Sequence, residues 1–360
     1  MIKVGSDFSG VGAFDQALRR LNIDYKTVYS CDMDKYARQS YIANYGEPNY
    51  YPKNVYHRII PEDSLDIYMT SPPCQSFSLA GKRKGEDSVN GVLFYNSHEF
   101  IMKNKPRYFI FENVKGLLSD AKGRTFQTWL DMLGGKSVNG NPVIFPREDA
   151  APYHIYHKVL NAKHFGVPQN RERVFIIGIR DDQDNSFKFP KPFHLTKRLK
   201  DVLESDVNEK YYLSDKAINS LINNPDVLQK SKVDPEIASA LQSPGNACGN
   251  YKGMNAISIN ENTKKGYTTA CRGDGFYINR PHQKRGVVQK KATPCIKTGG
   301  DIGILDITGT VRRLTPRECF RLMDFPDSFK FVCSDTQMYK QAGNSIVVNV
   351  LSEIINKLVK

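Results

Sequence analysis

A cysteine directly after two prolines is the first residue of this chain whose setting suggests chemistry. Pro72 and Pro73 follow an apolar run at 65–70 that is typical of a short buried strand. Two consecutive prolines fix φ and restrict the residues before them, so the chain must leave the strand along a stiff, extended path. A thiol held just past a strand end suits a nucleophile, although a single Pro-Cys is more often a buried cysteine beside a turn. Cys74 is therefore a candidate nucleophile whose assignment depends on its neighbours.

Three further strand ends carry residues of compatible chemistry. Gly10 and Gly12 follow a strand at 2–6, where glycines let the backbone approach a ligand at the start of a helix. Asp32 lies 20 residues beyond Gly12, a spacing that suits a carboxylate accepting hydrogen bonds from a ribose. Glu112 ends an apolar run and is costly to bury unless it is paired or functional. A tight turn alone would explain the glycines as well, but the glycines and Asp32 together indicate a nucleoside-bearing cofactor. For Glu112 alone, a structural and a catalytic role are equally open.

A pair of arginines begins another predicted strand. Strand alternation points Arg171, Arg173 and Phe175 to the same side. An ordinary charged strand entry is the alternative explanation for these residues.

The elements that must position these groups alternate in the first 180 residues. Apolar strands are predicted at 2–6, 27–31, 66–70, 107–111, 155–160 and 174–179. Their alternation with helical stretches predicts an α/β fold with a doubly wound, mostly parallel sheet. Four parts are expected: a catalytic and cofactor-binding domain at 1–188, an inserted, smaller and irregular domain at 189–310, a return segment at 311–340, and a C-terminal helix at 341–360. Asn344 or Ser345 is expected to cap that helix, which must pack back on the first domain.

Charge and composition narrow the class of protein. The 360-residue chain carries 51 basic and 38 acidic residues, a net charge of +13. Ten basic and two acidic residues fall in 252–297, with aromatic residues and glycines between them. Such a surface favours phosphate contacts, although a solvated charged face is the alternative. The seven cysteines include no C-x-x-C pair, which argues against a disulfide framework or zinc site and favours the cytoplasm. Neither a signal peptide nor a membrane-spanning run is found.

Six short motifs, in one order along the chain, resemble those of the cytosine-C5 DNA methyltransferases. They are the turn at 7–14, Pro72-Pro73-Cys74-Gln75-Ser76-Phe77-Ser78, Glu112-Asn113-Val114, Gln169-Asn170-Arg171-Glu172-Arg173, Arg313-Leu314-Thr315-Pro316-Arg317-Glu318-Cys319 and Gln341-Ala342-Gly343-Asn344-Ser345. The chain looks most like the compact bacterial modification enzymes. The unmatched centre of the chain falls where that family places its target-recognition domain, so the resemblance implies this role for 189–310.

The resemblance implies a covalent mechanism. Cys74 would attack C6 of a cytosine flipped from the duplex. Glu112 would bind N3 and the exocyclic amine, and Arg173 would hold O2 and stabilise the charge that develops there. Arg171, in the same motif as Arg173, is also expected to be catalytic. The activated C5 would take a methyl group, and loss of the C5 proton with elimination of Cys74 would release 5-methylcytosine. No metal is needed.

S-adenosyl-L-methionine is the cofactor that the resemblance implies. Phe8, Gly10 and Gly12 would surround its methionine part, Asp32 would take the ribose, and Met33 would pack on the adenine. The full set of implied cofactor-binding residues is Phe8, Gly10, Gly12, Asp32, Met33, Asn54, Pro72 and Asn344. Asn54 stands near a position where the family usually has an aspartate that contacts adenine.

Double-stranded DNA is the implied partner. The segment 78–88 resembles the family's mobile loop that closes over DNA, and its three consecutive basic residues would face phosphates. The expected DNA-binding residues are Lys82, Arg83, Lys84, Arg272, Lys290, Lys291 and Thr293. A monomer is expected, and any cognate restriction endonuclease would be a separate protein.

Two alternatives to DNA methylation are open. The same scaffold methylates RNA cytosines in one branch of the family, but that branch's characteristic target-region segment is not found, and the long basic insertion suits duplex DNA. A catalytically inactive DNA-binding relative should have lost Cys74 or Glu112, and the chain keeps both. The sequence therefore predicts a DNA (cytosine-5-)-methyltransferase, either from a restriction-modification system or an orphan modification enzyme.

Overall fold

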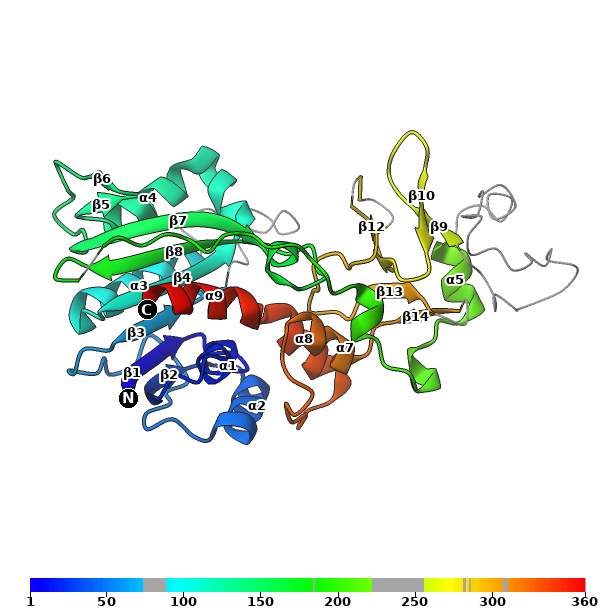
Figure 1. Cartoon of the computed structure of the whole chain (residues 1–360), viewed down its shortest axis with the longest axis horizontal. Helices are drawn as coiled ribbons and strands as arrows, with labels where there is room; N and C mark the ends of the chain where they lie inside the picture. Colours follow the sequence, from blue (N-terminus) through cyan, green and yellow to red (C-terminus); the bar gives the residue numbers. More distant parts are fainter. Residues whose placement is uncertain are drawn as a thin grey trace, which may run out of the picture.

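The computed structural model describes residues 1–73, 89–183, 185–221, 256–280, 283–284, 286–306 and 310–359. These residues form a large α/β lobe and a smaller, mostly β lobe, joined by a helical segment (Figure 1). Within the described ranges, no helix is both long and apolar enough to cross a membrane.

An eight-stranded mixed sheet lies at the centre of the large lobe. Its strands are, in spatial order, β2 (Tyr25–Cys31), β1 (Ile2–Asp7), β3 (Ile67–Thr70), β4 (Tyr108–Val114), β8 (Glu172–Arg180), β7 (Tyr153–Asn161), β5 (Ser137–Val138) and β6 (Asn141–Pro142). The first four are parallel, whereas β8 runs antiparallel to β4 and β7, and β6 antiparallel to β5. The predicted α/β fold and its six strands are confirmed, and the sheet is mixed beyond β4.

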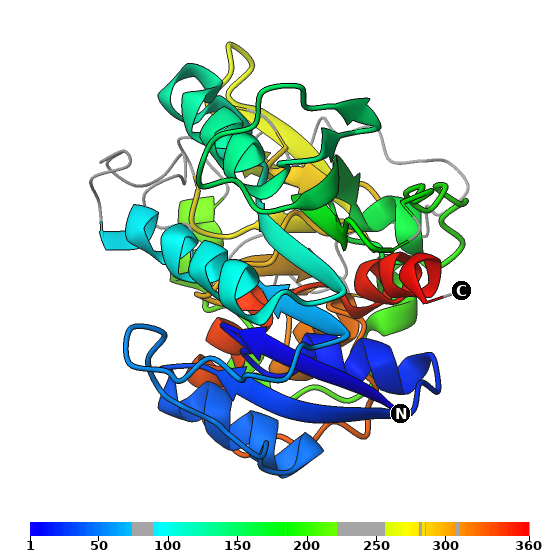
Figure 2. The same cartoon turned by 90° about the vertical axis from the view of Figure 1, so that its left-hand side faces the viewer.

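Helices cover both faces of the sheet, as the prediction of a doubly wound fold requires. The large lobe contains α1 (Ala13–Arg20), α2 (Lys35–Tyr45), α3 (Val89–Asn104), α4 (Arg124–Leu133) and α9 (Val348–Leu358). Alternation along β3 sends Ile67 and Met69 into the apolar layer under α1 and α9, while Tyr68 packs in the layer under α3 and α4. Figure 2 shows these two helical layers on opposite sides of the sheet.

The smaller lobe consists of short antiparallel strands. It contains α5 (Asp215–Leu221), a pair formed by β9 (Ala256–Asn260) and β10 (Tyr267–Cys271), and a sheet in the order β12 (Val288–Gln289), β11 (Gly275–Tyr277), β13 (Ile302–Leu305) and β14 (Val311–Arg313). The predicted boundary after residue 310 falls between two paired strands, since Gly303 of β13 lies opposite Arg313 of β14. The small sheet therefore extends to Arg313.

The return segment carries α7 (Pro316–Leu322) and α8 (Asp335–Asn344) before the chain reaches α9. The C-terminal helix packs against the large lobe, because Leu351, Ile354 and Ile355 are fully buried in the core cluster that also contains α1. Its predicted start is wrong. Asn344 is the last residue of α8, and α9 begins after Val347, which provides no side-chain cap. A three-residue break between two helices leaves the apolar periodicity almost unchanged, so the sequence pattern did not separate them.

Candidate active site

The strand directions bring Glu112, Arg171 and Arg173 to one edge of the sheet. The parallel strands β1, β3 and β4 all end at this edge. Because β8 is antiparallel to β4, it begins where β4 ends, and Arg173 lies opposite Val114. The sequence alone did not show this reversal, which places the start of one strand beside the ends of three others. Ligands bind at such carboxyl edges in open α/β sheets.

Glu112 and Arg173 form an ion pair at this edge. The distance between Arg173 Nε and Glu112 Oε1 is 3.1 Å, and their side chains are only 16% and 9% exposed respectively. They sit two residues apart in register on neighbouring strands, as a diagonal cross-strand pair. Burial raises the pKa of Glu112, although the charges of Arg173 and Arg171 oppose that rise. Glu112 can therefore keep a proton at a higher pH than an ordinary glutamate.

The segment that leads to the candidate nucleophile is anchored as far as the structure describes it. Pro72 is buried, and its carbonyl oxygen accepts a hydrogen bond from Asn113 Nδ2 at 3.3 Å. The prediction that Pro72 contacts the cofactor stays a prediction. Cys74 lies outside the described residues, as do the predicted DNA contacts in the loop that follows it, Lys82, Arg83 and Lys84.

Arg171 joins three parts of the chain. Its side chain is buried, and its guanidinium donates to the carbonyl oxygens of Ile296 at 3.1 Å, Gly343 at 3.0 Å and Ser345 at 2.7 Å. These bonds attach the start of β8 to the small lobe and to the turn between α8 and α9. The structure thus gives Arg171 a tethering position beside Arg173, and its predicted catalytic role stays a prediction.

The turn after β1 carries Phe8, Gly10 and Gly12, whose predicted contact with the cofactor stays a prediction. Phe8, Gly10 and Gly12 have φ values of 57°, 55° and 81°, and Gly12 is the N-cap of α1. No described side chain is recorded within 4 Å of the position where a Cβ on Gly10 would stand, which leaves room for a ligand against the backbone. Asp32 Oδ2 accepts from the Gly10 amide at 2.8 Å, so the turn and the end of β2 form one unit.

The polar and apolar groups around this turn fit S-adenosylmethionine. Asp32 Oδ1 accepts from the Asp34 amide at 2.8 Å, and each carboxylate oxygen retains a second lone pair for a ribose hydroxyl. Burial raises the pKa of Asp32, while the amides of Asp34 and Gly10 oppose the rise. Met33 is 81% exposed at the end of β2, an apolar surface that an adenine ring can cover. Asn54 and Asn344 are also exposed, and their predicted cofactor contacts stay predictions.

A buried ion pair under this cradle was not identified from the sequence. Arg58 Nη2 lies 3.3 Å from Asp7 Oδ2, and both side chains are almost completely buried. The hydroxyls of Tyr29 and Tyr68 also donate to Asp7. Arg58 stands 51 positions after Asp7 in a segment without clear periodicity, so no local signal could have paired them.

The predicted DNA contacts of the small lobe divide into two groups. Arg272, Lys290 and Lys291 are exposed on its surface, as phosphate-binding side chains should be. Thr293 is fully buried instead, and its amide donates to the carbonyl of Pro168 at 2.8 Å. Thr293 therefore joins the small lobe to the segment before β8, and its predicted DNA contact stays a prediction.

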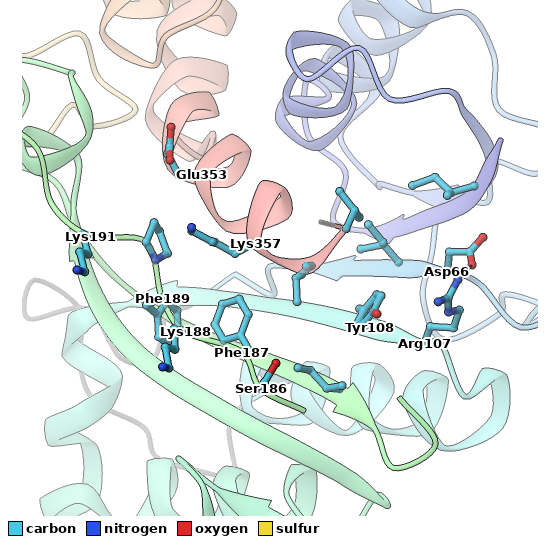
Figure 3. Close-up of a pocket in the computed structure, with 16 residues that line it drawn as sticks. Asp66, Arg107, Tyr108, Ser186, Phe187, Lys188, Phe189, Lys191, Glu353 and Lys357 are labelled. Atoms are coloured by element: carbon cyan, nitrogen blue, oxygen red, sulfur yellow. Dashed lines mark hydrogen bonds and ion pairs between the residues drawn. The ribbon is translucent and has the colours of Figure 1, made fainter. Parts of the chain in front are cut away.

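A cavity of about 970 Å³ lies at the opposite edge of the sheet (Figure 3). Asp66, Arg107 and Tyr108 line it at the starts of β3 and β4, and Lys357 reaches it from α9. None of the predicted site residues that the structure describes lines this cavity. The carboxyl edge therefore remains the candidate active site, because the Glu112–Arg173 ion pair and the glycine turn both lie there.

Comparisons with known proteins point to one family. The model of the C-5 cytosine-specific DNA methylases matches residues 2–360. An orphan methyltransferase of Bacillus phage SPR, M.SPRI, is 31% identical over 99% of this chain and 97% of its own length. The type II methyltransferase M.HpaII of Haemophilus parainfluenzae is 33% identical over 98% of this chain and 88% of its own. The crystal structure of the S. pombe Dnmt2 methyltransferase covers 100% of this chain and 98% of that one, with a TM-score of 0.61 at 18% identity, and shows the same fold.

Proposed function

This chain belongs to the C-5 cytosine-specific DNA methylase family, and we propose that it methylates C5 of a cytosine flipped out of duplex DNA through a covalent bond to Cys74. The observation that carries the proposal is the buried Glu112–Arg173 pair at the carboxyl edge of the sheet. An acid and a guanidinium placed together can bind a cytosine at N3 and O2 at the same time. Those two atoms take up electron density when the ring is attacked at C6.

Glu112 acts as the acid in this proposal. Its raised pKa favours the protonated carboxyl group, from which N3 would take a proton as the nucleophile pushes charge into the ring. Arg173 donates to O2 and stabilises the same charge from the other side. In the absence of DNA the two side chains form an ion pair, which holds both in place until a cytosine enters the site.

Cys74 supplies the nucleophile. A bond forms between its sulfur and C6, and the displaced ring electrons make C5 nucleophilic. After C5 is methylated, its proton passes to water, and the electrons of the C5–H bond re-form the C5–C6 double bond while the bond between C6 and sulfur breaks and releases Cys74 as a thiolate. The proton on N3 returns to Glu112. The chain thus returns with a free thiolate, and the reaction balances without an oxidant or a metal.

Methyltransferases of this family use S-adenosylmethionine, which supplies an electrophilic methyl group when bound. We assign its binding to the turn at Phe8–Gly12 and to the end of β2. Asp32 would hold the ribose and Met33 would cover the adenine, with Asn54 and Asn344 at the rim and Pro72 between this site and the nucleophile. The raised pKa of Asp32 reflects burial, and hydrogen bonds from ribose hydroxyls would compensate its carboxylate for lost water.

DNA would bind across both lobes. The exposed Arg272, Lys290 and Lys291 would contact phosphates from the small lobe, and Lys82, Arg83 and Lys84 would do so from the loop after Cys74. Type II and orphan enzymes both occur among the relatives, so the protein would act either as the modification half of a restriction-modification system or as an orphan enzyme. A cytoplasmic monomer is part of the same proposal.

Two experiments test the covalent step. Cys74→Ser should abolish transfer of a tritiated methyl group to DNA while cofactor binding survives; unchanged turnover would overturn the mechanism. Duplex DNA with 5-fluorocytosine at the target should form a denaturant-resistant adduct with the wild-type protein, because fluorine cannot leave C5 as a proton does. Bisulfite sequencing of DNA from an expressing host would first identify that target. Failure to trap an adduct at a site the enzyme demonstrably methylates would contradict the covalent intermediate.

A further inference from the structure

A second cysteine lies beside the catalytic pair. Cys295 follows β12 in the small lobe, and its sulfur lies 3.3 Å from Arg171 Nη1 and 3.9 Å from Arg173 Nη2. It is half-buried. Sulfur is a weak acceptor when neutral and a stronger one as a thiolate, so both guanidiniums can donate to it.

The sulfur of Cys295 reduces the repulsion between two neighbouring positive charges at the start of β8. Alternation places Arg171 and Arg173 on the same side of the strand, where their positive charges repel. In the described part of the chain, the ion pair of Glu112 is formed with Arg173, whereas Arg171 donates to the neutral carbonyl groups of three residues. A sulfur atom that accepts from both guanidiniums allows them to lie side by side.

The position of this sulfur is fixed from several directions. The hydroxyl of Tyr277 donates to the Cys295 carbonyl at 3.0 Å, and the following amide, of Ile296, donates to Gln169 Oε1 at 3.1 Å. Lys297 and Arg280 lie over the ring of Tyr277, with 5.1 Å and 4.9 Å to its centroid. Cys295 is therefore held by the small lobe on one side and by the segment before β8 on the other.

We propose that Cys295 is a positioning residue whose sulfur orients Arg173 toward Glu112 and couples the small lobe to the catalytic pair. This inference rests on the proposed role of Arg173 in holding the target base. Burial raises the pKa of the Cys295 thiol, but the charges of Arg171 and Arg173 outweigh it, so the net pKa is lowered. The other titratable groups facing the thiol are Tyr277 and Lys297.

Single-turnover methyl transfer at saturating DNA and cofactor tests the positioning role. Cys295→Ala should slow the transfer about tenfold, the effect of losing a hydrogen bond to a charged group. Cys295→Ser should retain most of the rate, because a hydroxyl oxygen also accepts from guanidinium. Affinities for DNA and cofactor should change less than twofold in both, and Cys271→Ala, which removes an exposed thiol of the same lobe, should match the wild type. A wild-type rate for Cys295→Ala, or a loss confined to DNA affinity, would overturn the inference.

A second measurement does not depend on activity. Iodoacetamide alkylates a thiolate by forming a sulfur–carbon bond and releasing iodide, and mass spectrometry of the Cys295 peptide follows the reaction across pH. The midpoint for Cys295 should lie below that for Cys271, and Arg173→Gln should raise it. An identical midpoint in Arg173→Gln would refute the contact. If the wild type methylates no DNA while this shift is seen, the proposed function fails and the contact stands.

Discussion

Arg58 and Asp7 form an ion pair under the cofactor turn, with 3.3 Å between Nη2 and Oδ2 and side-chain exposures of 1% and 0%. Arg58 also donates to the carbonyl of Val55 at 2.5 Å and to that of Asn96 at 2.6 Å. One guanidinium thus fastens the segment that carries Asn54 to the end of β1 and to α3. Burial raises the pKa of Asp7, and Arg58 is the main group that opposes the rise.

Removing Arg58 should therefore destabilise the fold strongly. Arg58→Met leaves the Asp7 carboxylate buried without its cation, and breaking a buried pair in this way typically costs about 3–5 kcal/mol. Urea denaturation measures the loss. Arg107→Met is the matched control, since Arg107 pairs with Asp66 at 3.1 Å but is 45% exposed, and exposed pairs contribute about 0–1 kcal/mol. Equal losses in the two variants would show that the Arg58 pair does not anchor this region.

Glu112 should give the stability a measurable pH dependence. Its pKa in the folded protein is raised above the ordinary value of 4.5, so the folded state holds the proton more tightly than the unfolded chain does. Ionisation then penalises folding, and wild-type stability relative to Glu112→Gln should fall as pH rises from about 4.5 through the folded pKa, then stay constant. Denaturation of both proteins across this range checks the sign. If wild-type stability instead rises relative to that of Glu112→Gln over this pH range, Arg173 lowers the pKa of Glu112 more than burial raises it.

Methyl transfer should respond to the same substitution. Glu112→Gln keeps the shape but cannot supply a proton to N3, so the transfer rate should fall by roughly 10²–10⁴, the usual contribution of a general acid. Binding of S-adenosylmethionine, measured by calorimetry, should be unchanged because Glu112 lies outside the glycine turn. Glu99→Gln, at an exposed position on α3, is the control. A rate within a few-fold of wild type would exclude Glu112 as the acid.

Gly12 should not tolerate a side chain. Its φ of 81° is unfavourable for other residues, and a Cβ there would stand 2.3 Å from a ring carbon of Tyr45. The Tyr45 hydroxyl is itself bound to Gln16 Oε1 at 3.0 Å, which restricts its movement. Gly12→Ala should therefore lower both the melting temperature and cofactor affinity. Gly140→Ala isolates the backbone cost, since φ is 84° and no atom lies near its Cβ position; equal effects of the two changes would exclude the clash.

Local patterns in the sequence were sufficient to predict most of the strands and candidate site residues of the large lobe. Apolar runs located six strands, and the motifs at their ends contained Glu112, Arg173 and the cofactor turn. Contacts between distant segments had no such signal. Arg58 reaches Asp7 through a segment without periodicity, and the sulfur of Cys295 reaches Arg171 from the other lobe, more than 120 positions later. Thr293 illustrates the opposite problem, because its basic neighbours suggested a surface position for a residue that the structure buries.

The basic surface of the small lobe offers a final test, because Lys290 and Lys291 differ from Thr293 in being exposed. The backbone around them is fixed independently of their ammonium groups, since the Lys291 amide donates to Asp274 Oδ1 at 2.8 Å and its carbonyl accepts from Leu199 at 3.0 Å. Charge reversal at both positions should therefore change the surface potential without unfolding the lobe.

Each lysine that neutralises a phosphate releases counterions on binding, so its loss reduces the dependence of affinity on salt by about one unit of log–log slope. Lys290→Glu combined with Lys291→Glu should weaken DNA binding most at low salt and flatten that slope, as fluorescence anisotropy across a salt series would show. Lys26→Glu, on the edge strand β2 of the other lobe, reverses a charge away from the proposed interface and should leave the slope unchanged. If both proteins bind DNA with the wild-type affinity at every salt concentration, the basic stretch is a solvated face and DNA lies elsewhere.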